Sequence, residues 1–349
     1  MSEVAVEILR GTQVESTASL DVAVVDSKGQ LIAWAGNPDH PAFWRSSAKP
    51  FQALPLLFSG AADAWDLTPE ELAITAASHG GEPRHVKLVQ AILEKIHATP
   101  AHLLCGSDWP ITPQARHALE VHNQQPTVLH NNCSGKHAGM LMLATQLGTS
   151  WRGYHDPAHP VQNAIFHVVQ HMTGGSDPQP LIRAVDGCGV PTFYLLLNRM
   201  AFAFAQLVDP CQLDANWQTA ARRMAQALQH HPEIISGEGR LEHRLGTATH
   251  HRFVAKGGAE AVFCMGIPDR QWGLAMKIRD GSPRVLAPAL LDVLGQLGLL
   301  DPADRHHLDD LIDPVLRNQQ GIAVGQIRSV VTLHTAHVGA VRTTAPHPD

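Results

Sequence analysis

The order of the hydrophobic patterns along the chain constrains the fold more than any single motif. Residues 1–45 carry strand patterns, and "SLDVAVVDSKGQLIAWAG" predicts two strands joined by a tight turn at 26–29. The middle carries helical periodicity instead, in segments such as 135–148, 191–207 and 216–231. Strand patterns return after about residue 250, in "HRFVAK", "AEAVFCMGI" and "WGLAMKI". One sheet is therefore expected to form from both ends of the chain, around an inserted helical region.

This order predicts an α+β fold with mainly antiparallel pairing, because the hairpins are short. We expect a single domain over 1–338, with its sheet built from about 1–45 and 250–338 and a loose tail at 339–349. Local signals add detail: Thr68 is predicted to start a helix as its N-cap, with Glu71 completing a capping box. A turn is predicted at Gly257-Gly258.

Composition excludes several classes of protein. Of the 349 residues, 44% are hydrophobic and 17% charged, which is typical of a globular protein and not of a disordered one. The net charge of -6 and the lack of a basic stripe argue against a nucleic-acid partner. We expect no membrane partner, because no apolar stretch is long enough to span a bilayer. With five cysteines outside any disulfide framework and no export signal, a cytoplasmic protein with reduced thiols is expected.

The segment "RSSAK" at 45–49 contains a Ser-x-x-Lys pattern, Ser46 and Lys49. Positions three apart share a helix face, so the hydroxyl and the amine can meet. A desolvated lysine can lose its proton near neutral pH and activate a serine. Lysine is rare here, and three of the lysines that do occur lie in "SSAK", "CSGK" and "AKGG". The alternative is a serine N-cap with an exposed lysine.

Two further segments hold a serine or a lysine beside paired glycines. "ASHGGEPRH" places Ser78 and His79 before a helix entrance, where glycines free backbone N–H groups to face a ligand. "FVAKGGAEAVF" places Lys256 at a strand end. Penicillin-recognising serine enzymes carry Lys-Thr-Gly on such a strand, whereas this chain lacks the threonine hydroxyl. A local turn at Ser78 is the simpler alternative.

A third pair of segments is rich in thiols. "HNNCSGKHAGM" contains Cys133, Lys136 and His137, and "VDGCGVPTF" contains Asp186 and Cys188. Two thiols with a carboxylate and either His137 or Lys136 could bind a zinc-like metal, although buried cysteines without a ligand are common. The segment "HHPEIISGEGRLEH", which includes Glu233, Glu238 and Arg240, either covers a site or forms a flexible surface loop.

Taken together and in their order along the chain, these segments resemble the rhizobial-type (class 3) L-asparaginases, the Asparaginase II family, over roughly residues 5–335. The resemblance implies a fold akin to the serine β-lactamases, hydrolysis of L-asparagine to L-aspartate and ammonia, and a homodimer. It also implies two Ser–Lys tandems, Ser46 with Lys49 and Ser78 with Lys256. The family's zinc site falls on Cys133, Lys136 and Cys188, with Asp186 close by. Because a lysine ligand must be neutral, zinc occupancy is expected to fall as the pH drops.

Two stretches depart from the family pattern. The family often has a serine where this chain has Gly80, and its "Cys-Gly-Pro-His" is replaced here by Cys105-Gly106-Ser107-Asp108. The first change removes a hydroxyl near the site. Neither change touches the four residues of the tandems.

The resulting hypothesis is nucleophilic amide hydrolysis, in which Ser46 attacks with Lys49 as its base. Ser78 and Lys256 would relay protons, and backbone N–H groups near Ser46 and at 257–258 would stabilise the oxyanion. The residues expected to bind substrate are Arg45, His137 and Asp186. Two rival hypotheses remain open: a penicillin-recognising serine hydrolase, and a non-catalytic scaffold that binds zinc.

Overall fold

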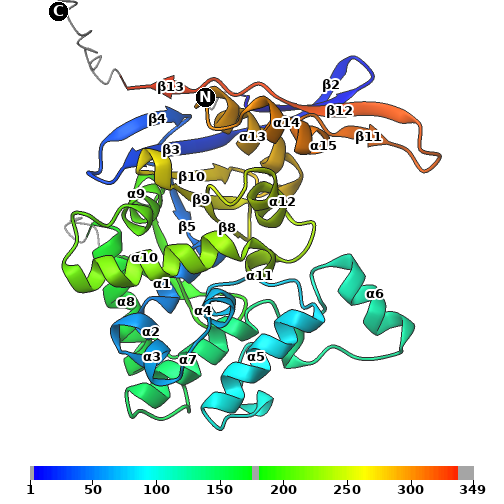
Figure 1. The fold of residues 1–349 in the computed structure, drawn as a ribbon. Helices are drawn as coiled ribbons and strands as arrows, with labels where there is room; N and C mark the ends of the chain where they lie inside the picture. The colour runs from blue at the N-terminus through cyan, green and yellow to red at the C-terminus, as the bar shows by residue number, and fades with distance from the viewer. Residues whose placement is uncertain (1–3, 175–180, 337–349) are drawn as a thin grey trace, which may run out of the picture.

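The structure is a computed structural model that describes residues 4–174 and 181–336. The tail predicted to be loose, 339–349, lies outside these residues. Figure 1 shows a central sheet with the inserted helical region below it and a smaller group of helices above it.

The strands are β1 (Val6–Arg10), β2 (Gln13–Ala18), β3 (Leu20–Asp26), β4 (Leu31–Ala35), β5 (Pro41–Phe43), β6 (Ile182–Val185), β7 (Pro191–Leu196), β8 (Val254–Gly258), β9 (Val262–Ile267), β10 (Trp272–Ile278), β11 (Val315–Arg317), β12 (Ala323–Ser329) and β13 (His334–Thr335). The helices are α1 (Lys49–Ala53), α2 (Pro55–Phe58), α3 (Ala61–Ala64), α4 (Pro69–Thr75), α5 (Pro83–Lys95), α6 (Pro113–Val121), α7 (Ser134–Gln146), α8 (Pro160–Met172), α9 (Leu197–Val208), α10 (Ala215–His230), α11 (Pro232–Ser236), α12 (Leu241–Ala248), α13 (Leu286–Gln296), α14 (Pro302–His307) and α15 (Asp309–Ile312). A short 3-10 helix, η1 (Arg45–Ala48), precedes α1.

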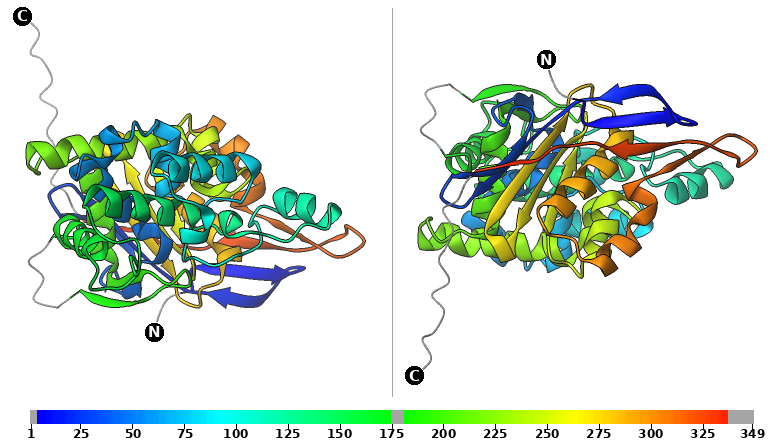
Figure 2. Two further views of the ribbon diagram at one scale, coloured as in Figure 1. Left: turned by 90° about the horizontal axis from the view of Figure 1, so that it is seen from below. Right: turned by 90° about the horizontal axis from the view of Figure 1, so that it is seen from above.

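The central sheet combines both ends of the chain, as predicted. Within the described residues its six strands run in the order β13-β4-β3-β10-β9-β8, and every neighbouring pair is antiparallel. The N-terminal hairpin β3–β4 joins the C-terminal strands through β3 and β10, with Ala23 opposite Ala275. Seen from above in Figure 2, the blue and yellow strands lie side by side. The predicted α+β class and sheet composition are confirmed.

The residues of β3 alternate between two hydrophobic cores. Ala23 and Val25 pack into the core shared with the helical region, whereas Val22 and Val24 pack into the core shared with α13. All four are almost fully buried. A strand covered on both faces needs apolar residues at every position, which explains the continuous run "VAVV".

Two smaller sheets extend the structure. The first, β11-β12-β1-β2, again pairs the two chain ends, and the second, β5-β7-β6, links the approach to η1 with a later segment. The prediction of one helix over 191–207 is wrong in its first third. Pro191–Leu196 forms β7 between β5 and β6, and the helix α9 begins only at Leu197. Backbone pairing with distant strands overrides the local periodicity there.

Local start signals are found where they were predicted. Thr68 caps α4 and forms the capping box with Glu71. The turn predicted at Gly257-Gly258 is wrong, because both glycines belong to β8. The chain reverses at 259–261 instead, where Glu260 and Ala261 take positive φ angles.

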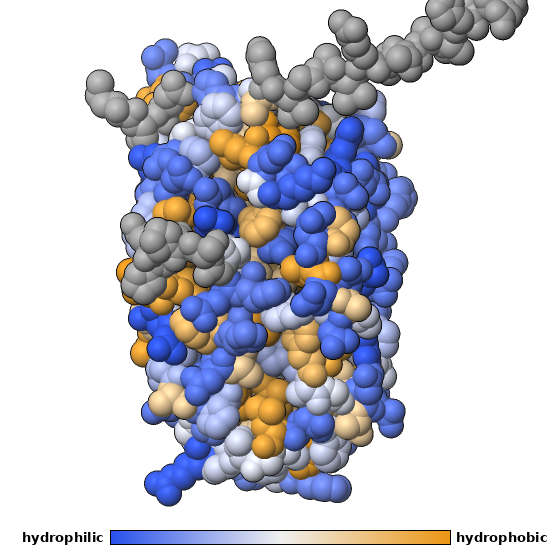
Figure 3. All heavy atoms as spheres, turned by 90° about the vertical axis from the view of Figure 1, so that its left-hand side faces the viewer, coloured by the Kyte–Doolittle hydropathy of each residue, from blue (hydrophilic) through white to orange (hydrophobic). Residues whose placement is uncertain are grey.

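The surface drawn in Figure 3 is mixed, and its apolar side chains form small patches separated by polar ones. Within residues 4–174 and 181–336, no helix has both the length and the apolar character needed to cross a bilayer.

Candidate active site

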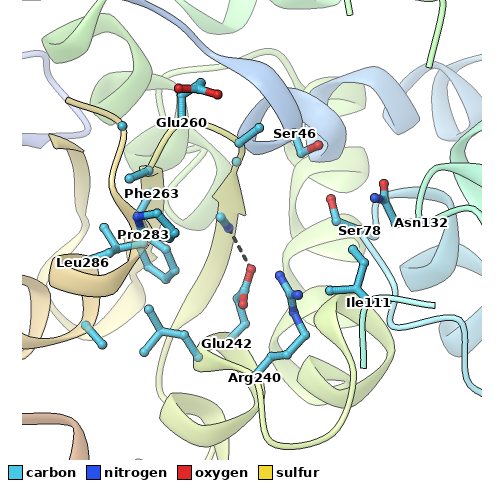
Figure 4. Close-up of a pocket in the computed structure, with 17 residues that line it drawn as sticks. Ser46, Ser78, Ile111, Asn132, Arg240, Glu242, Glu260, Phe263, Pro283 and Leu286 are labelled. Carbon is cyan, nitrogen blue, oxygen red and sulfur yellow. Dashed lines mark hydrogen bonds between the residues drawn. The ribbon is translucent and has the colours of Figure 1, made fainter. Parts of the chain in front are cut away.

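A cavity of about 560 Å³ lies where β8, η1 and α12 meet. Ser46 and Ser78 line it from the side of the helical region, and Arg240 and Glu242 line it from the start of α12 (Figure 4). The glycines 257 and 258 of β8 form part of its wall. Two of the predicted catalytic hydroxyls thus share one pocket, although they are 32 positions apart in the chain.

Ser46 is positioned by η1, which begins at a left-handed residue and is tied to β8 through Ser47. Arg45 has a φ angle of 49°, in the left-handed region, and this turns the chain into the 3-10 helix. The neighbouring Ser47 is fully buried, and its hydroxyl donates to the carbonyl oxygen of Lys256 at 2.8 Å. This bond ties η1 to β8. We did not predict it, because only the fold brings the two segments together.

Ser78 is positioned by its backbone and by the histidine that follows it. Its N–H donates to the carbonyl of Ile235 at 2.9 Å. His79 accepts the N–H of Gly81 at Nδ1, so its proton is on Nε2, which lies 2.8 Å from Ser134 Oγ. Burial lowers the pKa of His79 well below its ordinary value, so the ring is neutral. His79 therefore holds the loop that carries Ser78.

Two lysine amines contact the hydroxyl of Ser78. Lys49 Nζ lies 2.9 Å from Ser78 Oγ, and Lys256 Nζ lies 3.0 Å from the same oxygen. Both lysines are fully buried. Burial lowers the pKa of Lys49, and it lowers the pKa of Lys256 to about 7, even though the nearby carboxylate of Glu242 opposes that shift. A lysine with a pKa near 7 can accept a proton at neutral pH.

The contacts differ in one respect from the two predicted tandems. Ser78 and Lys256 are hydrogen bonded, as expected. Lys49, however, donates to Ser78 and to the carbonyl of Ala77 at 2.6 Å, and within the described chain no hydrogen bond joins it to Ser46. Lys49 is thus close to Ser46 in the sequence, but its amine donates to Ser78.

The glycines of β8 are not equivalent. The N–H of Gly257 donates to Glu242 Oε1 at 2.9 Å, so it is already engaged and cannot stabilise an oxyanion. The expectation for Gly257 is therefore wrong, and Gly258 remains the candidate of the pair. Gly258 lies close to η1, because a Cβ placed on it would come within 3.1 Å of Ser47 Oγ.

The predicted zinc ligands lie together in a second buried group, which we call the thiol cluster: Cys133, Lys136 and Cys188. Lys136 Nζ lies 3.0 Å from Cys188 Sγ. Hydrogen bonding with Cys133, together with Lys136, lowers the pKa of Cys188 to about 4. Burial would lower the pKa of Lys136, but the two thiols outweigh it and raise that pKa. Two sulfurs and an amine in contact are a suitable donor set for zinc.

Among the described residues, no three His, Cys, Asp or Glu side chains gather as a metal site. The thiol cluster fits a metal only because its third donor is a lysine. Asn131 orients Cys133, one of the predicted ligands, since its Oδ1 accepts the N–H of Cys133 at 2.8 Å. This bond accounts for part of the polar density of "HNNCSGKH".

The three residues expected to bind substrate lie outside the pocket lining. Arg45 Nε donates to Asp186 Oδ1 at 2.8 Å, so the two expected substrate contacts bind each other. His137 is fully buried, and its Nδ1 lies 2.6 Å from the hydroxyl of Tyr154. Burial and Lys136 lower the pKa of His137 to about 3.

Several polar lining residues had no role in the sequence-based hypothesis, among them Asn132, Arg240 and Glu242. Arg240 belongs to the glycine-rich loop that was expected either to cover a site or to be a flexible surface loop, and this loop was its signal in the sequence. Glu242 gave none, because a glutamate in the first turn of a helix is ordinary.

At position 80, where the family often has a serine, the side chain of Thr112 occupies the space next to the glycine. A Cβ on Gly80 would lie 2.5 Å from Thr112 Cγ2, and the Thr112 hydroxyl donates to the Gly80 carbonyl at 3.1 Å. Thr112 is almost fully buried. A serine at position 80 would therefore require Thr112 to move, so the glycine and the threonine fit as a pair.

Comparison with known proteins identifies the family. The model of a family described as L-asparaginase II matches residues 6–329, which is most of the chain. The chain belongs to this family. Membership supports an amidohydrolase of the asparaginase type. A search of curated proteins gave no match.

Solved structures with β-lactamase names are among the similar folds. A β-lactamase from Mycobacterium bovis has 14% identity and a TM-score of 0.41, with 80% of this chain and 95% of that chain covered. A β-lactamase from Burkholderia vietnamiensis has 16% identity and a TM-score of 0.40, with coverages of 80% and 93%. A protein named Mglu has 16% identity and a TM-score of 0.38, with coverages of 81% and 68%. At these scores we draw no activity from the likeness.

Proposed function

We propose that this protein is an L-asparaginase that hydrolyses L-asparagine to L-aspartate and ammonia by Ser–Lys catalysis. The observation that carries the proposal is the contact of two buried amines, Lys49 and Lys256, with the hydroxyl of Ser78 in the wall of a pocket that Ser46 also lines. Membership of the L-asparaginase II family supports the substrate.

In the proposed first step, Ser46 Oγ attacks the side-chain amide carbon of the substrate. Ser46 suits this role because, in the described part of the chain, no hydrogen bond to protein engages its hydroxyl. Its proton passes to the hydrogen-bonded group of Lys49, Ser78 and Lys256, in which a neutral amine accepts it. The group then protonates the amide nitrogen, the C–N bond breaks and ammonia leaves, while an ester joins Ser46 to the aspartyl group.

In the second step, water attacks this ester. The same amines take a proton from the water, the Ser46 Oγ–C bond breaks, and the serine regains its hydrogen as L-aspartate leaves. Ser78 suits the relay, because one hydroxyl can donate to one amine while it accepts from the other. The contact with both amines also makes Ser78 the competing nucleophile, and the experiment below separates the two.

We further propose that the thiol cluster binds zinc through Cys133, Lys136 and Cys188. Zinc would supply a positive charge beside the base group. Lys136 contacts Cys188 and so orients it. Cys133 directly follows Asn132, which lines the pocket, so the thiol cluster lies next to the pocket. The carbonyl of Asn132 also lies 3.4 Å from Lys49 Nζ.

The test measures ammonia release from L-asparagine and L-glutamine, with and without zinc, by the wild type and by Ser46→Ala and Ser78→Ala. We expect both variants to lose turnover by about 10²-fold or more, because a positioned base and a nucleophile each contribute at least that much. The exposed Ser150 provides a matched control, and Ser150→Ala should retain full activity.

Mass spectrometry of the quenched reaction locates the acyl group. An adduct on Ser46 in Ser78→Ala supports the proposal. An adduct on Ser78 in Ser46→Ala, with turnover retained, assigns the attack to Ser78. Turnover of nitrocefin without any release of ammonia would replace the proposed function by that of a penicillin-recognising hydrolase.

A further inference from the structure

Arg240 is the one cation among the described residues that line the pocket. Its guanidinium points into the cavity on the side of the two serines (Figure 4). The Nε atom is buried, and within the described chain it has no hydrogen-bond partner. A buried N–H group without a partner costs free energy, and a ligand that supplies an acceptor in the pocket removes that cost.

The backbone before Arg240 fixes its direction. Gly237 has a φ angle of 105°, and a Cβ there would collide with Thr112 and approach Gly80 within 3.1 Å. The N–H of Glu238 donates to Glu82 Oε1 at 2.8 Å, and that of Gly239 donates to His243 Nδ1 at 3.0 Å. The loop that was expected either to cover a site or to be flexible is therefore held by hydrogen bonds to Glu82 and to His243.

The same loop also holds Ser78. The N–H of Ser78 donates to the carbonyl of Ile235, two residues before Gly237. Arg240 and Ser78 thus stand on one continuous hydrogen-bonded frame. A group bound by Arg240 is held at a fixed position relative to the hydroxyl that contacts both amines.

The nearby carboxylate does not use up the charge of Arg240. Glu242 is almost fully buried and its Oε1 accepts the N–H of Gly257. Arg240 is near enough to help lower the pKa of Glu242, but in the described residues no ion pair within 4.0 Å joins the two side chains. Arg45, which was expected to bind the substrate's carboxylate, is already paired with Asp186. Arg240 is left as the pocket's available guanidinium.

We propose that Arg240 binds the α-carboxylate of the amino-acid substrate and thereby selects amides that carry this group. The planar fork of a guanidinium matches the two oxygens of a carboxylate. The inference rests on the proposed function in one respect, because that function supplies the amino-acid substrate whose amide reacts at the serines.

The experiment compares two amides that differ only in this carboxylate. 3-Aminopropanamide is L-asparagine without its α-carboxylate. Arg240→Gln should raise the KM for L-asparagine about 10- to 100-fold, which is typical for the loss of a charge-assisted hydrogen bond, with kcat nearly unchanged. Arg240 also helps to lower the pKa of Lys256, so the assays are run well above pH 7, where Lys256 is neutral in every variant. There the kcat/KM for 3-aminopropanamide should stay the same. Arg240→Lys should lie between the wild type and Arg240→Gln, because it keeps the charge and loses the fork.

Arg222→Gln is the matched control, since Arg222 is exposed on α10 and does not line the pocket. It should leave both substrates unaffected. Equal losses for both amides in Arg240→Gln would overturn the proposal, because they would show a role in structure or in the reaction itself. Melting temperatures of all variants establish that each one folds.

A second measurement separates this proposal from the proposed function. Calorimetry follows binding of L-aspartate and of L-asparagine to Ser46→Ala and to Ser46→Ala/Arg240→Gln. A weakening of about 10-fold or more in the double variant supports the carboxylate site even if the wild type releases no ammonia. Equal affinities for the two proteins, or no binding to either, would reject it.

Discussion

Lys256 and Lys136 are both buried lysines, yet the pKa values of their amines shift in opposite directions. Lys256 has no exposed surface and Lys136 has 3%. Burial lowers the pKa of Lys256 to about 7, and the single carboxylate of Glu242 only partly offsets that. The two thiols beside Lys136 outweigh the same burial and raise its pKa. Burial sets the penalty for a charge, and the neighbouring groups decide whether the charge is kept.

This difference suits the two lysines to different chemistry. The amine of Lys256 can be neutral near pH 7 and contacts a hydroxyl, so it can move a proton. The amine of Lys136 lies against the thiol of Cys188 and keeps its proton, which zinc would have to replace in the site proposed above. The two groups are adjacent, because Asn132 lines the pocket and Cys133 begins the thiol cluster.

The strongest test of this difference between the two lysines is to remove each amine separately. Lys256→Met keeps the volume and loses the base, so kcat should fall about 10²- to 10⁴-fold. Lys136→Met should keep measurable turnover and lose the stabilisation by zinc. For the wild type that stabilisation is about 2.7 kcal/mol when free zinc is one hundred times its Kd. Ammonia release and thermal unfolding with and without zinc measure both effects.

The opposite pattern would contradict this assignment. If Lys136→Met were as inactive as Lys256→Met even in excess zinc, the thiol cluster would belong to the reaction itself. If zinc still raised the melting temperature of Lys136→Met to the same extent, the amine would not be a ligand.

The pH dependence of kcat tests the role of Lys256 further, with a smaller expected effect. If a neutral Lys256 is required, kcat rises as the pH increases through about 7. Glu242 raises the pKa of Lys256, so Glu242→Gln should move this rise to lower pH, by on the order of one unit. Glutamine can still accept the N–H of Gly257 through its side-chain oxygen.

Glu238 offers a matched control in the same loop, because its side chain is 78% exposed. Glu238→Gln should leave the profile in place. A shift of the Glu242→Gln profile to higher pH, or no shift at all, would mean that another group controls the rate.

The smallest expected effect concerns the ion pair between Asp186 and Arg45, the residue that precedes Ser46. Burial would raise the pKa of Asp186, but Lys136, the N–H of Gly187 and Arg45 together lower it. Asp186→Asn should therefore cost about 1–2 kcal/mol of unfolding free energy at pH 7, with kcat within about threefold. The stability difference should be constant above the ordinary pKa of 3.8 and shrink as the pH falls below it.

Urea denaturation at several pH values measures this cost. Asp63→Asn is the comparison variant, because its ion pair with Arg223 is more exposed and should contribute less. If Asp186→Asn reduced kcat as strongly as Lys256→Met does, Asp186 would have to contact the substrate.

The fold was predictable where the pattern is local. The sheet strands at both ends alternate or run apolar over their whole length, and Thr68 and Glu71 mark a helix start by their spacing alone. The strand β7 was missed because "PTFYLL" runs directly into a helical segment, with no polar break between the two. Its partners β5 and β6 decided its conformation through hydrogen bonds across the sheet.

The site was predictable as a list of residues and not as a set of contacts. The motifs selected Ser46, Lys49, Ser78 and Lys256 because reactive residue types occur there beside glycines. They paired Lys49 with Ser46, its neighbour in sequence, whereas its amine contacts Ser78. Spacing along a helix predicts the helix face on which a side chain lies, but not which other segment packs against that face.

By itself the sequence determined the order of strands and helices, the family, and which side chains can carry the chemistry. All of these depend on residue type and short spacing, which folding does not alter. Only the tertiary structure decided that two amines meet on one hydroxyl, that Arg45 is paired with Asp186, and that Arg240 faces the cavity. Such contacts join segments that are far apart in the chain, and a pKa follows from burial and neighbouring charges that exist only once those segments have packed.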